Sequence, residues 1–119
     1  MSADEQMTNT QDLIQLAIRA AKNGNKDGAR VMLRQVIQRD RRNEQAMLWM
    51  AKIARNGDER EDWLNKILEV NPNNPTAQKQ LGKMQYGREA VNNRMLMFYG
   101  FVTVLMLILV IVIVLIVAL

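Results

Sequence analysis

Apolar residues recur at spacings of three and four along most of the chain, and the last 25 positions form one continuous apolar run. The first kind of spacing is typical of amphipathic helices that bury one side. Five such stripes are present: Leu13, Leu16, Ala17 and Ala20; Ala29, Met32, Leu33, Val36 and Ile37; Met47, Met50, Ala51 and Ala54; Leu64, Ile67 and Leu68, with Trp63 alongside; and Ala77, Leu81 and Met84. The pattern predicts an all-α chain with two helix hairpins, a further helix and an apolar final helix.

Turn residues separate the stripes. Gly24 and Gly57 stand where the residue after a helix needs a positive φ. Asp58 and Glu61 have the spacing of a capping box, and Pro75 follows an asparagine as the expected first residue of a fifth helix. The sequence therefore predicts where each hairpin turns and where the fifth helix begins.

The final apolar run, residues 95–119, contains no charged side chain, and only Tyr99, Gly100 and Thr103 interrupt it mildly. A helix needs about 20 apolar residues to cross the hydrocarbon core of a bilayer. The aromatic residues expected at the membrane interface are Phe98, Tyr99 and Phe101. The run predicts one transmembrane helix over 95–119, placed at the end of the chain as in tail-anchored proteins.

Charge predicts the orientation of this span. The net charge of +4 belongs entirely to the first 94 residues. The basic residues just before the span are Lys79, Lys83, Arg88 and Arg94, with only Glu89 among them. The positive-inside rule then places the N-terminal part in the cytoplasm, with a bacterial inner membrane as the expected location. Anionic lipid headgroups are compatible partners for the basic residues.

Two segments of the polar part repeat each other, residues 12–43 and residues 45–74. The residues that carry the pattern in the first are Leu13, Leu16, Ala17, Ala20, Gly24, Ala29, Leu33 and Val36. The second keeps Met47, Met50, Ala51, Ala54 and a closing Asn-Pro-Asn-Asn, and Leu81-Gly82 begins a third unit that does not complete. This pattern resembles the tetratricopeptide repeat (TPR), a helix hairpin of about 34 residues. Leu13 stands where the family usually has Trp, and Arg41 where it has Pro.

The predicted organisation is a disordered lead-in over 1–10, two TPR-like hairpins over 11–74, a capping and juxtamembrane helix over 75–93, and the span. The resemblance implies a protein-binding groove lined by the first helix of each hairpin. Its residues would be Gln11, Ile14, Ile18, Lys22, Leu48, Lys52 and Arg55. A cationic rim around apolar residues suits an amphipathic partner segment with acidic side chains. The alternative is that the three apolar residues pack against the lead-in or between the repeats.

Composition argues against catalysis. The chain has no cysteine and no histidine, and its only serine is Ser2, which excludes the commonest metal, nucleophilic and acid–base sites. No glycine-rich phosphate loop is present, so we expect no cofactor. The basic stretch over 19–42 lacks residues placed to read bases, and nucleic acid is an improbable partner.

Two functions of different classes remain. The chain is either a small accessory subunit that stabilises or scaffolds a multisubunit membrane complex, or an adaptor that recruits a soluble protein to the membrane. The subunit interpretation is preferred, because a short array of repeats needs partners for stability. Compact arrays of this kind resemble accessory subunits of bacterial respiratory or photosynthetic assemblies.

Overall fold

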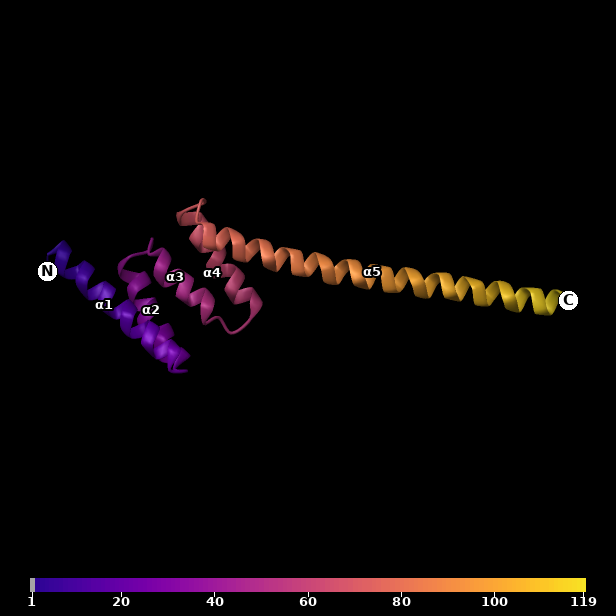
Figure 1. Ribbon diagram of the computed structural model, residues 1–119, viewed down its shortest axis with the longest axis horizontal. Helices are drawn as coiled ribbons and strands as arrows, with labels where there is room; N and C mark the ends of the chain where they lie inside the picture. Colours follow the sequence, from indigo (N-terminus) through magenta and orange to yellow (C-terminus); the bar gives the residue numbers. More distant parts are fainter. Residues whose placement is uncertain (1) are drawn as a thin grey trace. The chain divides into compact units, whose positions relative to one another are not determined.

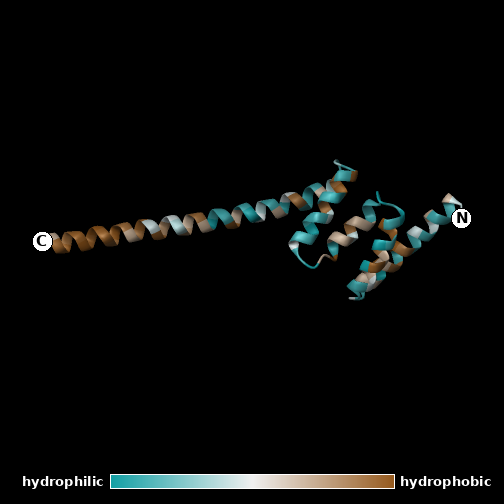
Figure 2. Ribbon diagram, turned by 180° about the vertical axis from the view of Figure 1, so that it is seen from behind, coloured by the Kyte–Doolittle hydropathy of each residue, from teal (hydrophilic) through white to brown (hydrophobic). Residues whose placement is uncertain are grey.

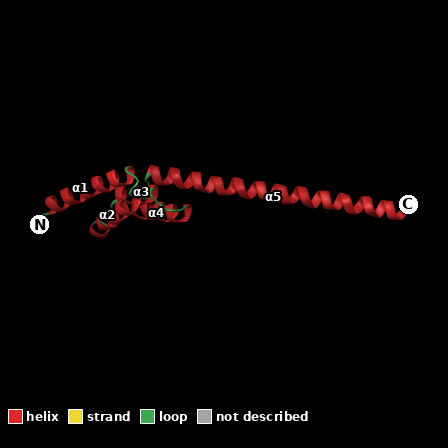
Figure 3. Cartoon of the chain, turned by 90° about the horizontal axis from the view of Figure 1, so that it is seen from below, coloured by secondary structure: helices red, strands yellow, loops and turns green. Residues whose placement is uncertain are grey.

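The computed structural model describes residues 2–119, and all regular structure in this range is helical (Figure 3). The five helices are α1 (Ala3–Lys22), α2 (Lys26–Arg39), α3 (Glu44–Lys52), α4 (Gly57–Val70) and α5 (Pro75–Ala118) (Figure 1). Helices α1 and α2 form one hairpin and α3 and α4 a second, which confirms the predicted all-α class. The residues fall into two compact units, one reaching to Leu81 and the other formed by Gly82–Leu119.

Helix α1 begins at Ala3, so residues 3–10 are helical rather than the predicted disordered lead-in. Ser2 and Glu5 form a capping box: the Ser2 Oγ accepts from the Glu5 N–H at 3.3 Å, and the Ser2 N–H donates to the Glu5 Oε2 at 3.2 Å. The acidic side chains in the first turn also interact favourably with the positive end of the helix dipole. The capping box, and not an apolar stripe, therefore stabilises the polar first turns of α1.

The core of the first unit joins the first hairpin to α3. Its buried cluster consists of Ile14, Ala17, Ala29, Leu33, Val36, Ala46, Met50 and Ile53. The stripe predicted for α1 is rotated: Ile14 is fully buried, whereas Leu16 is 51% exposed. The physical reason is that α1 has apolar residues around much of its circumference, and the positions of α2 and α3 decide which of them are covered.

The other stripes lie where the sequence predicts them. Buried residues from these stripes include Leu33 and Val36 in α2, Met47 and Met50 in α3, Leu64 and Ile67 in α4, and Ala77 and Leu81 in α5. Tertiary packing of one apolar side is the main source of helix stability in proteins. The second hairpin and the start of α5 therefore extend the helical core of the first unit.

One of the predicted turns is correct and one is not. Gly24 has a φ of 86° after α1, as expected. Gly57 instead belongs to the first turn of α4, because Asn56 is the N-cap and its Oδ1 accepts from the Glu59 N–H at 2.8 Å. An asparagine two residues earlier thus takes the capping role predicted for Asp58. Pro75 is the first residue of α5, as predicted.

The second unit consists of the remainder of α5. Figure 2 shows that its C-terminal part is hydrophobic throughout, whereas the part before it is mostly hydrophilic. Helix α5 is long and apolar enough to cross a membrane, and it carries no charged residue after Arg94.

Candidate functional site

The two loops that lead into α3 and α5 share two hydrogen bonds at equivalent positions. Asn43 caps α3 by accepting from the Ala46 N–H at 2.9 Å, and Asn74 caps α5 by accepting from the Ala77 N–H at 2.9 Å. Three residues before each cap, a side chain binds the loop backbone: Asp40 accepts from the Arg42 N–H and Asn71 from the Asn73 N–H, both at 3.1 Å. The caps are 31 residues apart, so the internal repeat predicted from the sequence extends to these hydrogen bonds.

Glu44 closes the second of these loops. Its Oε1 accepts from the Asn74 Nδ2 at 2.8 Å and from the Asn71 Nδ2 at 2.9 Å. These two bonds, first that of Asn74, hold the pKa of the Glu44 carboxyl below its usual value. Asn74 is itself buried, and the Arg42 Nη2 donates to the Val70 carbonyl at 3.1 Å nearby. The loop into α5 is therefore fully engaged with the start of α3.

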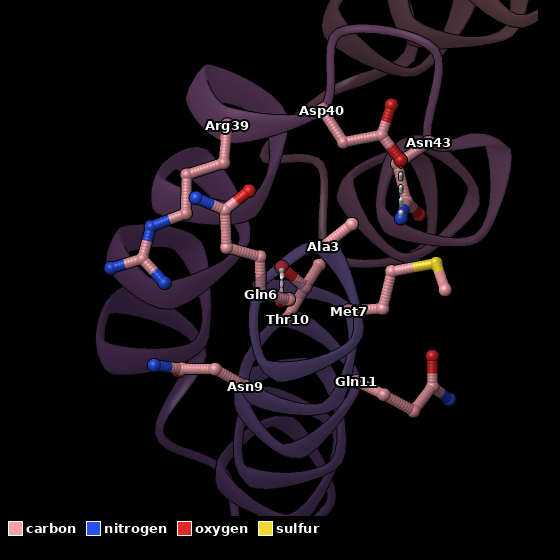
Figure 4. A pocket seen from close by; sticks show the side chains of 9 residues that line it. All are labelled: Ala3, Gln6, Met7, Asn9, Thr10, Gln11, Arg39, Asp40 and Asn43. Atoms are coloured by element: carbon pink, nitrogen blue, oxygen red, sulfur yellow. Dashed lines mark hydrogen bonds between the residues drawn. The ribbon is translucent and has the colours of Figure 1, made fainter. Parts of the chain in front are cut away.

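The loop into α3 instead borders an open cavity of about 780 Å³ (Figure 4). It is lined by Ala3, Gln6, Met7, Asn9, Thr10, Gln11, Arg39, Asp40 and Asn43. Two of the lining side chains are bonded to other lining residues: Asn43 donates to the Asp40 Oδ2 at 3.2 Å, and Thr10 donates to the Gln6 carbonyl at 2.8 Å. Most of the lining is neutral and polar, which suits hydrogen bonding rather than the capture of a charged group.

A buried arginine joins the two hairpins. Arg30 in α2 is only 3% exposed, and its Nη2 donates to the Ile53 carbonyl at the end of α3 at 2.9 Å. Its guanidinium also lies 3.2 Å from the Asp27 Oδ1 and 3.6 Å from the Glu59 Oε1. The Arg55 N–H donates to Glu59 at 2.9 Å, and this bond first of all lowers the pKa of the Glu59 carboxyl.

The predicted groove residues differ in their burial. Ile14 lies in the core, which for this residue is the alternative of packing between repeats. Ile18 and Leu48 are half-buried, and the remaining four are exposed: Gln11, Lys22, Lys52 and Arg55. The Lys52 Nζ lies 4.3 Å from the centre of the Trp49 ring, and Arg55 lies 3.6 Å from Asp27. Gln11 is the one groove residue that lines the cavity.

The residues predicted to flank the membrane all lie on α5 and are exposed. They are Lys79, Lys83, Arg88 and Arg94, followed by Phe98, Tyr99 and Phe101. Phe98 and Tyr99 meet edge to face, with ring centres 6.4 Å apart. Because successive residues turn by about 100°, Lys83 and Arg94 share one side of the helix with both phenylalanines.

Sequence reasoning missed the two polar networks around Arg30 and Glu44. A signal for the second was available, since asparagines recur 31 residues apart at positions 43 and 74. Residues 2–119 contain no group of three or more acidic side chains that could hold a metal ion. No family model, curated protein or solved structure matches this chain.

Proposed function

We propose that this chain is a non-catalytic, single-span membrane subunit that docks to a multisubunit membrane complex and stabilises or scaffolds it. Helix α5 carries the proposal. It buries Ala77 and Leu81 in the hairpin unit and then continues into an apolar stretch long enough for a membrane. A helix shared in this way ties a protein-binding unit directly to an anchor.

We further propose that the hairpin unit is a short TPR-like array. The repeat of caps and loop bonds 31 residues apart supports this assignment, as do the buried Ala17 and Ala51 at equivalent positions of the two hairpins. Arrays of stacked helix hairpins are generally protein-binding scaffolds. The proposed partners are accordingly proteins, above all integral subunits of the same complex.

The proposed topology places the hairpin unit in the cytoplasm, most simply at a bacterial inner membrane. The excess of Lys and Arg before the apolar stretch supports this orientation by the positive-inside rule. Arg88 and Arg94 also stand within about 10 Å of the start of the span along the helix axis. That distance is close to the Debye length, so both could interact with anionic headgroups.

Extraction experiments on the full chain in its own membranes test the proposal. We expect the protein to resist alkaline carbonate and, in mild detergent, to migrate with integral proteins in a fixed ratio. Release by carbonate would overturn the membrane anchor. Migration as a single 13.7 kDa chain in its micelle would overturn the subunit role.

The adaptor function is the second candidate. Its support is that Lys22, Lys52 and Arg55 are exposed, whereas Ile18 and Leu48 are half-buried; cationic and apolar residues together suit an acidic amphipathic segment. Exchange of residues 101–119 for an unrelated anchor separates the two functions. An adaptor keeps its soluble partner after the exchange, whereas a subunit docked through its span loses its place in the complex.

A further inference from the structure

The cavity beside the loop into α3 lies at a place that the second repeat fills with a side chain of its own. Glu44 is the first residue of α3, and its carboxylate accepts from both asparagine side chains of the loop into α5. Thr10 has the equivalent position in α1, because it precedes Ala17 by seven residues, as Glu44 precedes Ala51. The Thr10 hydroxyl donates to its own helix. The first repeat therefore lacks the side chain that closes the second.

The cavity has two walls, and both belong to the first compact unit. One wall is the N-terminal part of α1, where residues 3–9 precede Thr10 and so have no counterpart in α3. The other is the end of α2 with the loop into α3, which contributes Arg39, Asp40 and Asn43 (Figure 4). The volume of about 780 Å³ is within the range of small-ligand sites. A partner group therefore has room where the second repeat places a carboxylate.

The charges at the cavity favour a neutral occupant. Arg39 is the only cation and Asp40 the only anion among the lining side chains, so the lining has no net charge. The side chains of Gln6, Asn9 and Gln11 are neutral amides and make no hydrogen bond within residues 2–119. An ionised ligand would lose its hydration without an opposite charge in excess, and a carboxylate would also face Asp40. A neutral polar group fits the lining best.

The loop itself selects among neutral groups. The Asp40 carboxylate accepts from the Arg42 N–H and from the Asn43 Nδ2, which leaves about half of its acceptor capacity. The Asn43 Nδ2 has a second hydrogen to donate. A primary amide presents a donor and an acceptor as two atoms on one edge, whereas the N–H and C=O of a trans peptide bond point in opposite directions. The side-by-side acceptor and donor of the loop therefore match a primary amide.

We propose that this cavity binds an asparagine or glutamine side chain of a protein partner. Its amide N–H donates to Asp40, and its amide oxygen accepts from Asn43. The pairing is complementary to that of the second loop, where two amides surround the carboxylate of Glu44. Gln6, Asn9 and Gln11 are then available to the neighbouring peptide groups of the partner segment. This inference rests on the proposed function for the protein nature of the partner and specifies the chemistry by which the partner is recognised.

Three short peptides test the recognition on the full chain in detergent micelles. Each has the sequence Gly-Ala-X-Ala-Gly between an acetyl group and an N-methyl amide, so that only the peptide with asparagine at X has a primary amide. We expect this peptide to bind about tenfold more tightly than those with aspartate or leucine in an NMR titration, because aspartate faces Asp40 and leucine leaves the loop groups unpaired. Equal affinities, no binding, or tighter binding of the aspartate peptide would overturn the proposal.

A paired variant locates the binding in the cavity. Thr10→Glu together with Asp40→Asn gives the first loop the carboxylate and the amides of the second, so we expect the affinity for the asparagine peptide to fall at least about tenfold. Thr8→Glu together with Asp12→Asn makes the same two changes at exposed residues of α1 outside the cavity. The control is closely matched, because the Thr8 hydroxyl donates to the Asp4 carbonyl as that of Thr10 does to Gln6. Equal affinities of the two paired variants would overturn the assignment to the cavity.

Native electrophoresis of the same variants, extracted from their own membranes, relates the cavity to assembly. We expect the variant at Thr10 and Asp40 to lower the assembled fraction about fivefold, as expected for the loss of one anchoring contact, and the control at Thr8 and Asp12 to leave it unchanged. An unchanged fraction in both, with migration in a fixed ratio, would overturn the cavity as a docking site and leave the subunit role standing. Release of the unsubstituted chain by carbonate would instead overturn the membrane anchor, and the peptide titration would still decide on the cavity.

Discussion

The loop into α3 and the loop into α5 have the same backbone hydrogen bonds, but their surroundings differ. In the second, the Glu44 carboxylate binds both loop asparagines, Asn71 and Asn74. In the first, Thr10 takes the place of Glu44, since Thr10 precedes Ala17 as Glu44 precedes Ala51. Its hydroxyl donates instead to the Gln6 carbonyl of its own helix. An open cavity remains at this loop.

The comparison separates two levels of organisation. The caps and loop bonds depend on residues within a few positions of one another, so the repeat reproduces them. Closure of the loop depends on one side chain from the preceding first helix and differs between the two. The first junction is secured elsewhere, by the Arg30 guanidinium between α2 and the end of α3.

The largest effect is expected from removing that guanidinium. Arg30→Ala deletes the donor to the Ile53 carbonyl and leaves a hole between the hairpins, so we expect a loss of about 3 kcal/mol in the free energy of unfolding. Urea unfolding of the full chain in detergent micelles measures it, because the only two tryptophans, Trp49 and Trp63, both lie in this unit. Arg34→Ala, one turn further along and exposed, should cost less than about 0.5 kcal/mol. Equal losses would show that the first junction does not depend on Arg30.

The next-largest loss of stability is expected from replacing the two capping asparagines, and the two losses should differ. Asn43→Ala removes a cap and an exposed bond, for an expected loss of about 1 kcal/mol. Asn74→Ala removes the equivalent cap and also a bond to the charged Glu44, for about 2 kcal/mol. The same urea titration measures both. A loss at Asn43 as large as that at Asn74 would mean that closure by Glu44 adds nothing.

The sequence predicted most of the fold because each stripe belongs to a helix with a definite covered side. Leu33 and Val36 are buried as expected, and so are Leu64 and Ile67. It failed on α1, where Ile14 and Leu16 are both apolar but point about 160° apart. Only the arrangement of neighbouring helices decides which of the two is covered.

The candidate sites were less predictable, because their contacts join distant positions. Asparagine caps are local and can be read from the sequence. The contact of Glu44 with Asn74 spans 30 residues and that of Arg30 with Ile53 spans 23. A helical period does not specify such pairs. The start of α1 was missed for a different reason, since Ser2 and Glu5 form a capping box with no apolar stripe directly behind it.

Acid should weaken the two junctions through different carboxylates. Glu59 at the first and Glu44 at the second both have a lowered pKa in the folded chain. The unfolded chain therefore takes up protons first as the pH falls. The stability that these groups contribute is complete above about pH 4.3, the usual pKa of glutamate, and is lost as the pH falls through the lower folded values.

Glutamine substitutions separate the two contributions. We expect Glu44→Gln and Glu59→Gln each to flatten the loss of stability between pH 5 and pH 3, and the double variant to flatten it most. Urea unfolding at a series of pH values measures the slope. An unchanged slope in Glu44→Gln would mean that its bonds to Asn71 and Asn74 do not distinguish the charged carboxylate.

The smallest change in stability is expected from reproducing, at the loop into α3, the carboxylate–amide bonds that Glu44 makes at the loop into α5. Thr10→Glu together with Asp40→Asn reproduces the carboxylate and its two amide partners, one of them supplied by Asn43, next to the open cavity. We expect a gain of about 0.5 to 1 kcal/mol, the net contribution of a typical hydrogen bond network of this size after the ordering of one long side chain. Thr10→Glu alone should give no gain, because the new carboxylate would face that of Asp40. A gain in the single variant as large as in the double would show that filling the cavity, and not the amide pairing seen at Glu44, is what stabilises such a loop.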